Sequence, residues 1–414
     1  MTTTPLESDF DPFAPETMAD PYPALAGLLR SGEPAYLEHR EMWVVTRYDD
    51  VRAATKDHTR FSSADGIAYD RSRLPILFGV DPPDHTRLRR LISRDFTPRA
   101  VESWRPLVER ICGELVRAAV EAGEVDLVRE VLVPLPVRVI AALLGIPGDD
   151  VAQFKAWSEG VIEGFNANAR LRVHGRLGPD ATEEAAHRQR AAKKALSAVA
   201  NISVYFHTLL EERRAQPRGT DLISKLLAAN EDNLRDDELV WLCLALLVGG
   251  NETTTHLLGN LCVALMDHPG EHRLARTGPE PMAAAIEETL RFDPPVQSVF
   301  RTAAGDIEIG GTLIPRGSRV QLSFAAANRD PRRWDDPGRF SIERASDGHL
   351  SFGSGIHFCV GAPLVRLEAA TFLRQLFEST DAMALNGEPE RIKSPTFRGF
   401  ARLPMRLTPS ARAS

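Results

Sequence analysis

The chain has 414 residues, of which 43% are hydrophobic, and it carries a formal net charge of -7. This apolar content is enough for a large buried core and excludes a wholly disordered chain. The acidic balance argues against a nucleic-acid-binding protein, because such proteins normally present a strongly basic face. The four scattered cysteines show no paired spacing, which excludes a disulfide framework.

Residues 1–23 are acidic and Pro-rich, with neither the basic start nor the apolar stretch of a signal peptide. The longest apolar run, Leu239 to Val248, is too short to cross a bilayer and is interpreted as a buried helix. We therefore expect a cytoplasmic protein that contacts neither a membrane nor nucleic acid. Because no repeat or long linker divides the sequence, residues 1–414 are expected to form a single domain.

The segment that begins at Asp81-Pro-Pro predicts a helix start, with Pro83 in the first turn. On this helix His85 and Arg89 are four residues apart and therefore share a face. An ordinary solvated basic surface explains the opposite face, which carries three arginines: Arg87, Arg90 and Arg94.

Apolar residues at helical spacing predict three longer helices, at 107–122, 192–214 and 239–266. The last of these is apolar all round before Gly249 and should therefore cross the core. Gly249 and Gly250 then weaken the helix, and the acid–alcohol pair Glu252-Thr253 follows. A kinked core helix that turns towards solvent would show this pattern, and so would a helix that makes room for a ligand.

The pattern changes after residue 296. Asp306 to Ile309, then Gly310-Gly311, then Thr312 to Ile314 predict a hairpin with a two-residue turn, and 319–323 predicts another strand. The fold class is therefore expected to be mainly α with a smaller β region (α+β). Segments 66–80 and 166–180 resist assignment, and long irregular loops of this kind are often lids or binding loops.

One glycine-rich segment contains an unusual cysteine: Phe352-Gly-Ser-Gly-Ile-His-Phe-Cys-Val-Gly361. The glycines let the backbone around Cys359 approach another group closely. The predicted helix that follows, 362–377, places the sulfur beside a helix N-terminus, where amide dipoles stabilise a thiolate. Taken alone, Cys359 is nevertheless better explained as a buried structural residue, because free cysteines are among the most buried residue types.

The whole ten-residue pattern resembles the cytochrome P-450 signature, and further motifs occur in the family order. The resemblance implies a cytochrome P-450 fold, with haem b between the long central helix and the cysteine loop, and Cys359 as the iron ligand. It assigns the remaining haem contacts to six residues: His85, Arg89, Arg301, Phe352, His357 and Gly361. It also implies a structural lock in which Glu288 and Arg291, three apart on a helix, are joined by Arg339.

The resemblance further implies that the protein is a monooxygenase of the soluble, bacterial type within this family. Such an enzyme takes O2 and two electrons, supplied by a separate ferredoxin or flavodoxin, and inserts one oxygen atom into a hydrophobic small molecule by hydroxylation or epoxidation. The thiolate favours O–O cleavage, while Glu252 and Thr253 would guide protons. An acidic electron donor would dock on a basic face, formed by Arg87, Arg90, Arg94 and Arg366.

The substrate pocket is expected to be apolar and to include five residues: Ala245, Val248, Gly249, Val296 and Val299. Each of them is also well explained as an ordinary core residue. Arg71 and Arg73 are candidates to bind a substrate carboxylate, although a solvated loop is the simpler interpretation. Two other functions remain open: a haem-thiolate peroxygenase and a non-catalytic haem sensor. Neither of them requires the acid–alcohol pair.

Overall fold

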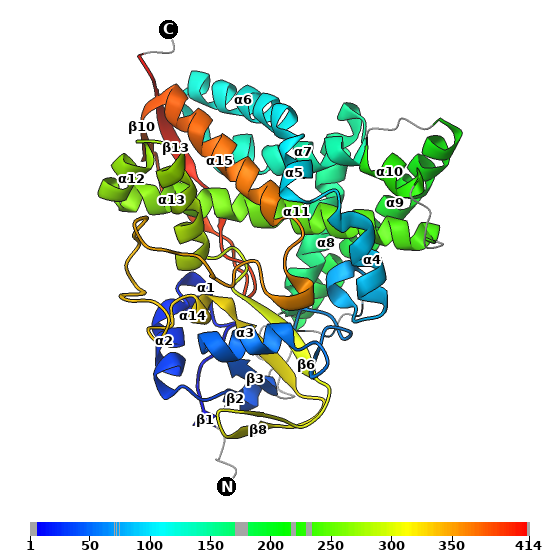
Figure 1. The fold of residues 1–414 in the computed structure, drawn as a ribbon, viewed down its shortest axis with the longest axis vertical. Helices are drawn as coiled ribbons and strands as arrows, with labels where there is room; N and C mark the ends of the chain where they lie inside the picture. The colour runs from blue at the N-terminus through cyan, green and yellow to red at the C-terminus, as the bar shows by residue number, and fades with distance from the viewer. Residues whose placement is uncertain are drawn as a thin grey trace.

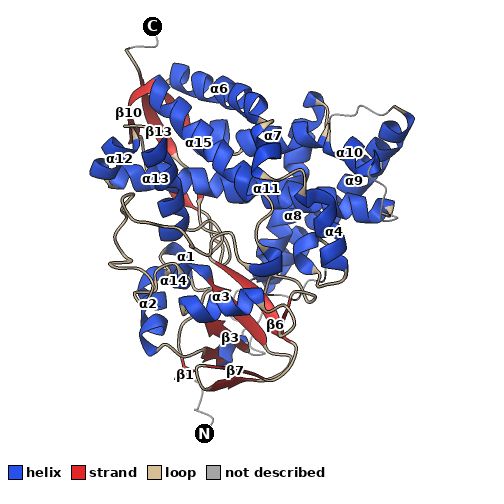
Figure 2. Cartoon of the chain, in the orientation of Figure 1, coloured by secondary structure: helices blue, strands red, loops and turns tan. Residues whose placement is uncertain are grey.

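The computed structural model describes residues 6–69, 71, 73, 75–169, 181–216, 221–228 and 234–411. Figure 1 shows the helices gathered around the long helix α11, with the largest sheet at the end of the molecule where the N-terminus lies. Helices predominate over strands in Figure 2. The expected class, mainly α with a smaller β region, is therefore confirmed.

The helices are α1 (Pro15–Ala19), α2 (Tyr22–Ser31), α3 (Tyr48–Lys56), α4 (Asp84–Ser93), α5 (Pro98–Glu102), α6 (Arg105–Ala122), α7 (Pro134–Leu144), α8 (Val151–Ala169), α9 (Ala181–Ala215), α10 (Leu222–Ala228), α11 (Asp236–Asp267), α12 (Pro269–Ala275), α13 (Pro279–Phe292), α14 (Phe324–Ala327) and α15 (Ala362–Ser379). The strands are β1 (Leu6–Glu7), β2 (Ala35–Leu37), β3 (Met42–Val45), β4 (Phe61–Ser62), β5 (Glu124–Asp126), β6 (Ser298–Ala303), β7 (Ile307–Ile309), β8 (Thr312–Ile314), β9 (Arg319–Ser323), β10 (Thr380–Leu385), β11 (Glu390–Arg391), β12 (Phe400–Arg402) and β13 (Pro404–Pro409).

Helix α11 contains the predicted central helix and packs against α7, α13 and α15. Three acidic residues in its first turn, Asp236 to Glu238, face the positive end of the helix dipole. Most of the side chains that follow are buried on every side, as expected for a helix that crosses a core. The helix therefore forms one wall of whatever space the core encloses.

The largest sheet has the strand order β1-β2-β3-β9-β6-β4. Its centre is mixed, because β9 runs parallel to β3 and antiparallel to β6. The predicted hairpin is present as β7 and β8, which pair from Ile309 and Thr312. Gly310 and Gly311 both adopt positive φ values, 60° and 85°, which the tight two-residue turn requires.

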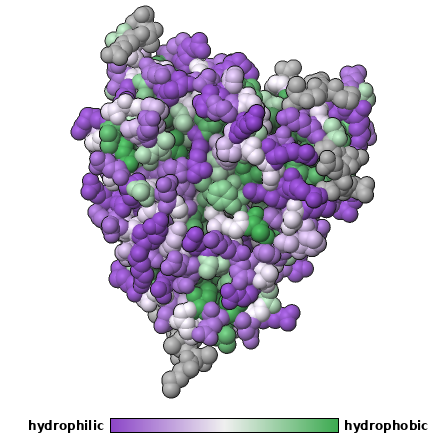
Figure 3. Space-filling model, viewed as in Figure 1, coloured by the Kyte–Doolittle hydropathy of each residue, from purple (hydrophilic) through white to green (hydrophobic). Residues whose placement is uncertain are grey.

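The two segments without a sequence assignment differ in the structure. Segment 66–80 contains a short 3-10 helix, Leu77–Gly79, while residues 70, 72 and 74 lie outside the described part of the chain. Segment 166–180 continues α8 as far as Ala169, and residues 170–180 lie outside the described part. No described helix is long and apolar enough to cross a membrane. The face in Figure 3 is mainly hydrophilic, with a few hydrophobic side chains near its middle.

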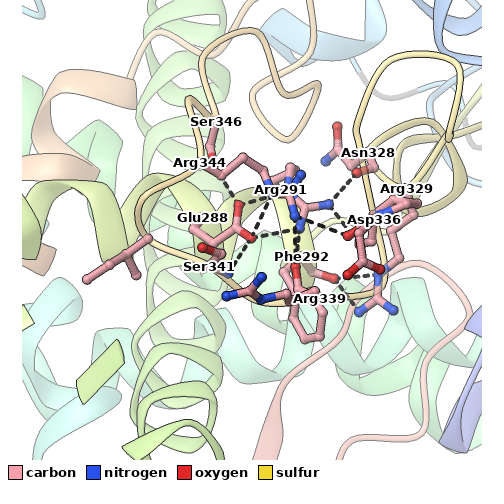
Figure 4. A network of polar contacts seen from close by, with 12 residues as sticks. Glu288, Arg291, Phe292, Asn328, Arg329, Asp336, Arg339, Ser341, Arg344 and Ser346 are labelled. Carbon is pink, nitrogen blue, oxygen red and sulfur yellow. Dashed lines mark hydrogen bonds and ion pairs between the residues drawn. The ribbon is translucent and has the colours of Figure 1, made fainter. Parts of the chain in front are cut away.

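Glu288 and Arg291 on α13 form a fully buried ion pair, with both side chains 0% exposed. The guanidinium donates to both carboxylate oxygens, from Nε and Nη2, at 2.7 Å each. Arg291 also donates to the carbonyls of Asn328, Pro337 and Arg339. Because each polar atom of this pair has partners, the pair joins α13 to the segment that precedes the cysteine loop (Figure 4).

The third charged side chain of this network is that of Arg344, which corrects the prediction for Arg339. Arg344 Nε lies 3.4 Å from Glu288 Oε1, and its other nitrogens donate to carbonyls of the same segment. Arg339 contributes its backbone carbonyl, and its side chain is exposed. The tight turn around Asp336, which has a φ of 43°, directs the carbonyls rather than the Arg339 side chain towards Arg291.

The corrected network predicts different effects for the two arginines. Arg344→Ala should lower the free energy of unfolding by about 1–3 kcal/mol, because it deprives the buried Glu288 carboxylate of a charged partner. The matched control Arg339→Ala should change it by less than about 0.5 kcal/mol, since only an exposed side chain is lost. Urea unfolding midpoints of the two variants measure the difference. Equal shifts would restore Arg339 as the third member.

Candidate active site

A cavity of about 330 Å³ lies between α11, β6 and the cysteine loop. Its wall is mainly apolar. All five predicted pocket residues line it: Ala245, Val248, Gly249, Val296 and Val299. Phe397 also reaches the cavity, and an isolated backbone bridge ties it to Val296. The structure thus brings together α11 and two segments about 50 and 150 residues further along the chain.

The cysteine loop is a tight structure that presents Cys359 to this cavity. The Cys359 N–H donates to the carbonyl of Phe352 at 2.9 Å, which closes the loop. Gly353 and Gly355 have φ values of 69° and 70°, which side-chain-bearing residues rarely adopt. A Cβ on Gly355 would also lie 2.7 Å from Lys56 Cα. The glycines are therefore needed both for the turn and for its contact with α3.

The Cys359 sulfur lies at the N-terminal end of α15, which begins at Ala362. Burial raises the pKa of the Cys359 thiol, while backbone N–H groups of Gly361 and Ala362 and the charge of Arg89 act in the opposite direction. A bare thiolate is thus costly here, although several groups are placed to stabilise one. A cation bonded to the sulfur would remove this cost, since a metal deprotonates a coordinating thiol outright.

Four basic side chains converge on another part of the cavity wall: His85, Arg89, Arg301 and His357. The rings of His85 and His357 lie 4.4 Å apart, and neither ring nitrogen of His85 has a hydrogen-bond partner among the residues that the structure describes. Arg301 is 5% exposed, and within the described part of the chain its guanidinium donates to the backbone carbonyl of Phe300 rather than to a carboxylate. Buried donors without acceptors are rare, so this cluster indicates an anionic ligand.

The electrostatics of the cluster support the same inference. Burial lowers the pKa of Arg301 to about 10. Burial, together with the charges of Arg301, His85 and Arg89, lowers the pKa of His357 to about 2. The nearby carboxylate of Asp81 offsets part of the positive charge of the cluster, since it acts on Arg301 and His85, and His357 is a neutral imidazole that also contacts Ser63 Oγ at 3.2 Å. Two carboxylates would supply the missing acceptors and charge.

The site calls for a cation at the Cys359 sulfur and for carboxylates at the basic cluster. Haem fits both requirements, because it carries a cationic iron and two propionates. Cys359 would hold the iron, and the four basic side chains would hold the propionates. Phe352 and Gly361 would form the loop beneath the ring, as their positions on the cavity wall allow. When bound, a thiolate-ligated haem supplies the chemistry of dioxygen activation.

Two glycines of helix α11 leave free space where the helix lines the cavity. A Cβ built on Gly249 or Gly250 would meet no atom within 4 Å, so this stretch leaves free space. The Thr253 hydroxyl donates to the Gly249 carbonyl at 2.9 Å. Glu252 and Thr253 both line the cavity. The glycine pair therefore makes room for a ligand, and an acid and an alcohol stand beside that room.

The expected basic face is less positive than its arginines suggest. Arg87 forms an ion pair with Glu238, and Arg366 binds both oxygens of Glu287 at 2.7 and 2.8 Å. The outer residues Arg90 and Arg94 are exposed, and the side chain of Arg366 is 42% exposed although it is ion-paired. Arg71 and Arg73 both pair with Asp65, which contradicts their availability for a substrate carboxylate. Sequence spacing could not reveal Glu238 and Glu287 as partners, because they come from distant elements, whereas Asp65 lies six and eight residues before the two arginines that it binds.

Glu368 on α15 is a cavity residue that the sequence gave no reason to select. It is 2% exposed and contacts Thr254 of α11. Burial raises its pKa to about 8, so the side chain is protonated at neutral pH. An acidic residue among apolar helical positions, nine residues after the cysteine, was its only signal. A neutral carboxylic acid here can donate a hydrogen bond to the hydroxyl of Thr254.

Glu368 should make the protein less stable as the pH rises. Between its ordinary pKa of 4.5 and about 8, the unfolded chain has released a proton that the folded chain keeps, so stability falls across that window. Glu368→Gln should remove this contribution, up to about 1.4 kcal/mol per pH unit. Unfolding midpoints of the holoprotein from pH 5 to 8 measure it, with exposed Glu121→Gln as control. Parallel curves for Glu368→Gln and the wild type would refute the buried neutral acid.

A family model described as cytochrome P-450 matches residues 35–274 and 281–407. The chain is 36% identical to beta-dihydromenaquinone-9 omega-hydroxylase of Mycobacterium tuberculosis, over 97% of this chain and 79% of the relative. It is also 36% identical to vitamin D(3) 25-hydroxylase of Pseudonocardia autotrophica, over 99% of both. Its identity to the cytochrome P-450 monooxygenase PikC of Streptomyces venezuelae is 36%, over 98% of this chain and 95% of that one.

Solved structures give the same result. An epothilone B-bound cytochrome P-450 superposes with a TM-score of 0.86 at 29% identity, covering 97% of this chain and 100% of the other. A cytochrome P-450 from Chondromyces apiculatus has a TM-score of 0.83 at 36% identity, over 97% and 99%. Together with the thiol loop and its basic cluster, these similarities show that the chain belongs to the cytochrome P-450 family of haem-iron monooxygenases.

Proposed function

We propose that this protein uses haem b and O2 to insert one oxygen atom into a large, uncharged, hydrophobic molecule, by hydroxylation or epoxidation. One observation carries the proposal. A single apolar cavity is lined by the Cys359 thiol, by the four basic residues of the cluster, and by the acid–alcohol pair Glu252-Thr253. A sulfur ligand, a propionate cradle and a source of protons are the protein groups that this chemistry requires.

Haem b is the form of the cofactor that the cysteine distribution supports. Cys359 is the only cysteine among the described residues that line the cavity. The other three, Cys112, Cys243 and Cys262, are buried in the packed core, and burial raises the pKa of each thiol. With no second thiol on this wall to form a thioether, the ring would be held by the sulfur–iron bond and by its propionates.

The charge of the cavity supports an uncharged substrate. If the basic cluster binds the propionates, the ionisable side chains that remain on the described wall besides Cys359 are Glu252 and the neutral acid Glu368. An anionic substrate would therefore meet no free cation, and it would lose its hydration without compensation. Relatives are named for dihydromenaquinone and vitamin D(3), and solved relatives hold epothilone B or testosterone. These molecules are large and mainly apolar.

Glu252 and Thr253 are proposed to deliver protons during oxygen activation. The carboxyl can exchange protons with solvent-derived water, and the hydroxyl can pass a hydrogen bond into the space that Gly249 leaves open. A haem-thiolate peroxygenase would need neither group, because hydrogen peroxide already carries both the oxygen and the protons. A haem sensor would not need them either. The pair therefore favours the monooxygenase over both alternatives.

Turnover with an electron donor tests this function. The haem-loaded protein is mixed with reductant, ferredoxin and its reductase, or with hydrogen peroxide alone, and testosterone and vitamin D(3) are the probes. The wild type should shift the ferric spin state with these probes but not with palmitate, and form product only with the reductant. Thr253→Ala should consume reductant but divert roughly tenfold more of it to peroxide. Thr253→Ser should retain coupling, because the hydroxyl is kept.

Each alternative predicts a different outcome of this experiment. Product from peroxide alone, at the rate seen with reductant, would indicate a peroxygenase. A spin-state shift without product under either condition would indicate a sensor. Unchanged product per electron in Thr253→Ala would refute the proton-delivery role. A colourless reconstituted protein would refute the haem site itself.

The electron donor is proposed to be an acidic ferredoxin or flavodoxin that docks beside α4. The inner face of α4 carries His85 and Arg89, and Arg89 acts on the Cys359 thiol, so α4 lies close to the sulfur. The outer face exposes Arg90 and Arg94. Phe358, which precedes Cys359, is 44% exposed and offers an apolar contact. Exposed cations around an apolar centre suit an acidic partner.

Charge reversal tests the docking face. Arg94→Glu should weaken binding of ferredoxin by roughly tenfold at low salt, and the difference should shrink as ionic strength rises, because exposed charges are screened. The control is Arg316→Glu, an exposed arginine between β8 and β9 in the sheet region. It should leave affinity unchanged. Equal losses in both variants, or none in Arg94→Glu, would remove α4 from the docking face.

A further inference from the structure

A buried histidine lies one helical turn beyond the proposed proton donor. His256 is 3% exposed, and its Nε2 lies 3.5 Å from Glu252 Oε1. Neither of its ring nitrogens has a hydrogen-bond partner within the described part of the chain. Buried polar atoms without partners are costly and uncommon, so the position of this imidazole needs an explanation.

The space around His256 is shaped for this ring. An ideal Cβ on Gly399 would lie 2.2 Å from His256 Nδ1, so no residue with a side chain fits at position 399 beside the imidazole. Gly399 is required for space alone, because its φ is not in the left-handed region. Phe397 is a cavity residue, and the centroid of its ring lies 6.3 Å from the centroid of the imidazole. The segment before β12 thus holds the imidazole against α11.

Only one of the two imidazole nitrogens faces a hydrogen-bond acceptor among the described residues. Its Nδ1 edge is closed by the Gly399 backbone, and its Nε2 edge is directed at the Glu252 carboxylate. Glutamate placed four residues before a cationic or donor residue is the favourable order on a helix. The separation of 3.5 Å is longer than a good hydrogen bond, but such contacts commonly tighten when an active site is complete.

We propose that His256 is a positioning residue that donates its Nε2–H to Glu252 and so holds the carboxylate at the wall of the cavity. The inference rests on the proposed role of Glu252 in proton delivery. Without this donor the carboxylate would be free to turn away from the space next to Gly249. Gly399 and Phe397 then act through the imidazole, because they fix the ring that fixes the acid.

Two substitutions separate the donor from the bulk of the ring. His256→Phe keeps a planar ring but has no N–H, whereas His256→Gln keeps an N–H donor at about the same reach. His256→Phe should raise the fraction of electrons lost to peroxide roughly tenfold, the size of effect seen when an orienting partner is removed. His256→Gln should recover most of the coupling. The double variant Glu252→Gln/His256→Phe should be no worse than Glu252→Gln alone.

A spectroscopic measurement tests the contact without turnover and without altering the histidine. In the diamagnetic ferrous carbonyl form, the imidazole signal of His256 is assigned in ¹⁵N-histidine-labelled protein by its absence from His256→Gln. Glu252→Gln should shift that signal, while exposed Glu121→Gln should leave it in place. This readout also holds if His256→Phe proves poorly folded.

The outcomes distinguish this inference from the proposed function. If Glu252→Gln uncouples turnover but His256→Phe does not, and the imidazole signal ignores Glu252→Gln, the positioning role is overturned and the role of Glu252 stands. If Glu252→Gln leaves coupling unchanged, the proposed role of Glu252 fails and the positioning role fails with it. A shifted signal together with uncoupling in His256→Phe and recovery in His256→Gln supports the inference.

Discussion

The site depends on one physical constraint: the proposed iron ligand, the sulfur of Cys359, is buried where a free thiolate is unfavourable. Burial raises the pKa of the Cys359 thiol, so the protein by itself does not support a free thiolate. The N–H groups of Gly361 and Ala362 and the guanidinium of Arg89 offset part of that cost, and a bound iron would supply the remainder. The glycine turn and the start of α15 position the sulfur, and the buried Glu288–Arg291 pair anchors the segment that precedes this loop.

The basic cluster of His85, Arg89, Arg301 and His357 shows the same cost of burying charge, with opposite sign. Neither ring nitrogen of His85 has a partner among the described residues, and the buried guanidinium of Arg301 donates to the backbone carbonyl of Phe300 rather than to a carboxylate. An anionic ligand would offset the positive charge that burial makes costly here. A bound haem would therefore complement the chain at two points, with its cationic iron at the sulfur and its carboxylates at the basic cluster. A ligand that binds the folded state so selectively must also add to its stability. The fold and the cofactor are in this sense one cooperative unit.

The rest of the cavity combines an apolar wall, which suits a substrate, with two acidic residues, of which Glu252 is proposed to deliver protons. Its apolar wall suits a hydrophobic molecule, whereas the acids Glu252 and Glu368 lie on helices α11 and α15. The two acids are held differently. Glu368 is buried and neutral beside Thr254, while Glu252 faces the imidazole of His256. Burial thus keeps Glu368 protonated, whereas the neighbouring imidazole of His256 provides Glu252 with a hydrogen-bond donor.

The sequence by itself determined the features that local order encodes: the helical periodicity of α11, the hairpin at Gly310-Gly311, and the glycine–cysteine loop with its helix. These depend on neighbours within one turn or one hairpin. Only the tertiary structure decided which distant groups meet. It gave Glu288 the guanidinium of Arg344 instead of Arg339, neutralised Arg87 and Arg366 with Glu238 and Glu287, and brought Gly399 against His256. Spacing along a chain cannot show such pairs, because burial and contact are set by packing between elements.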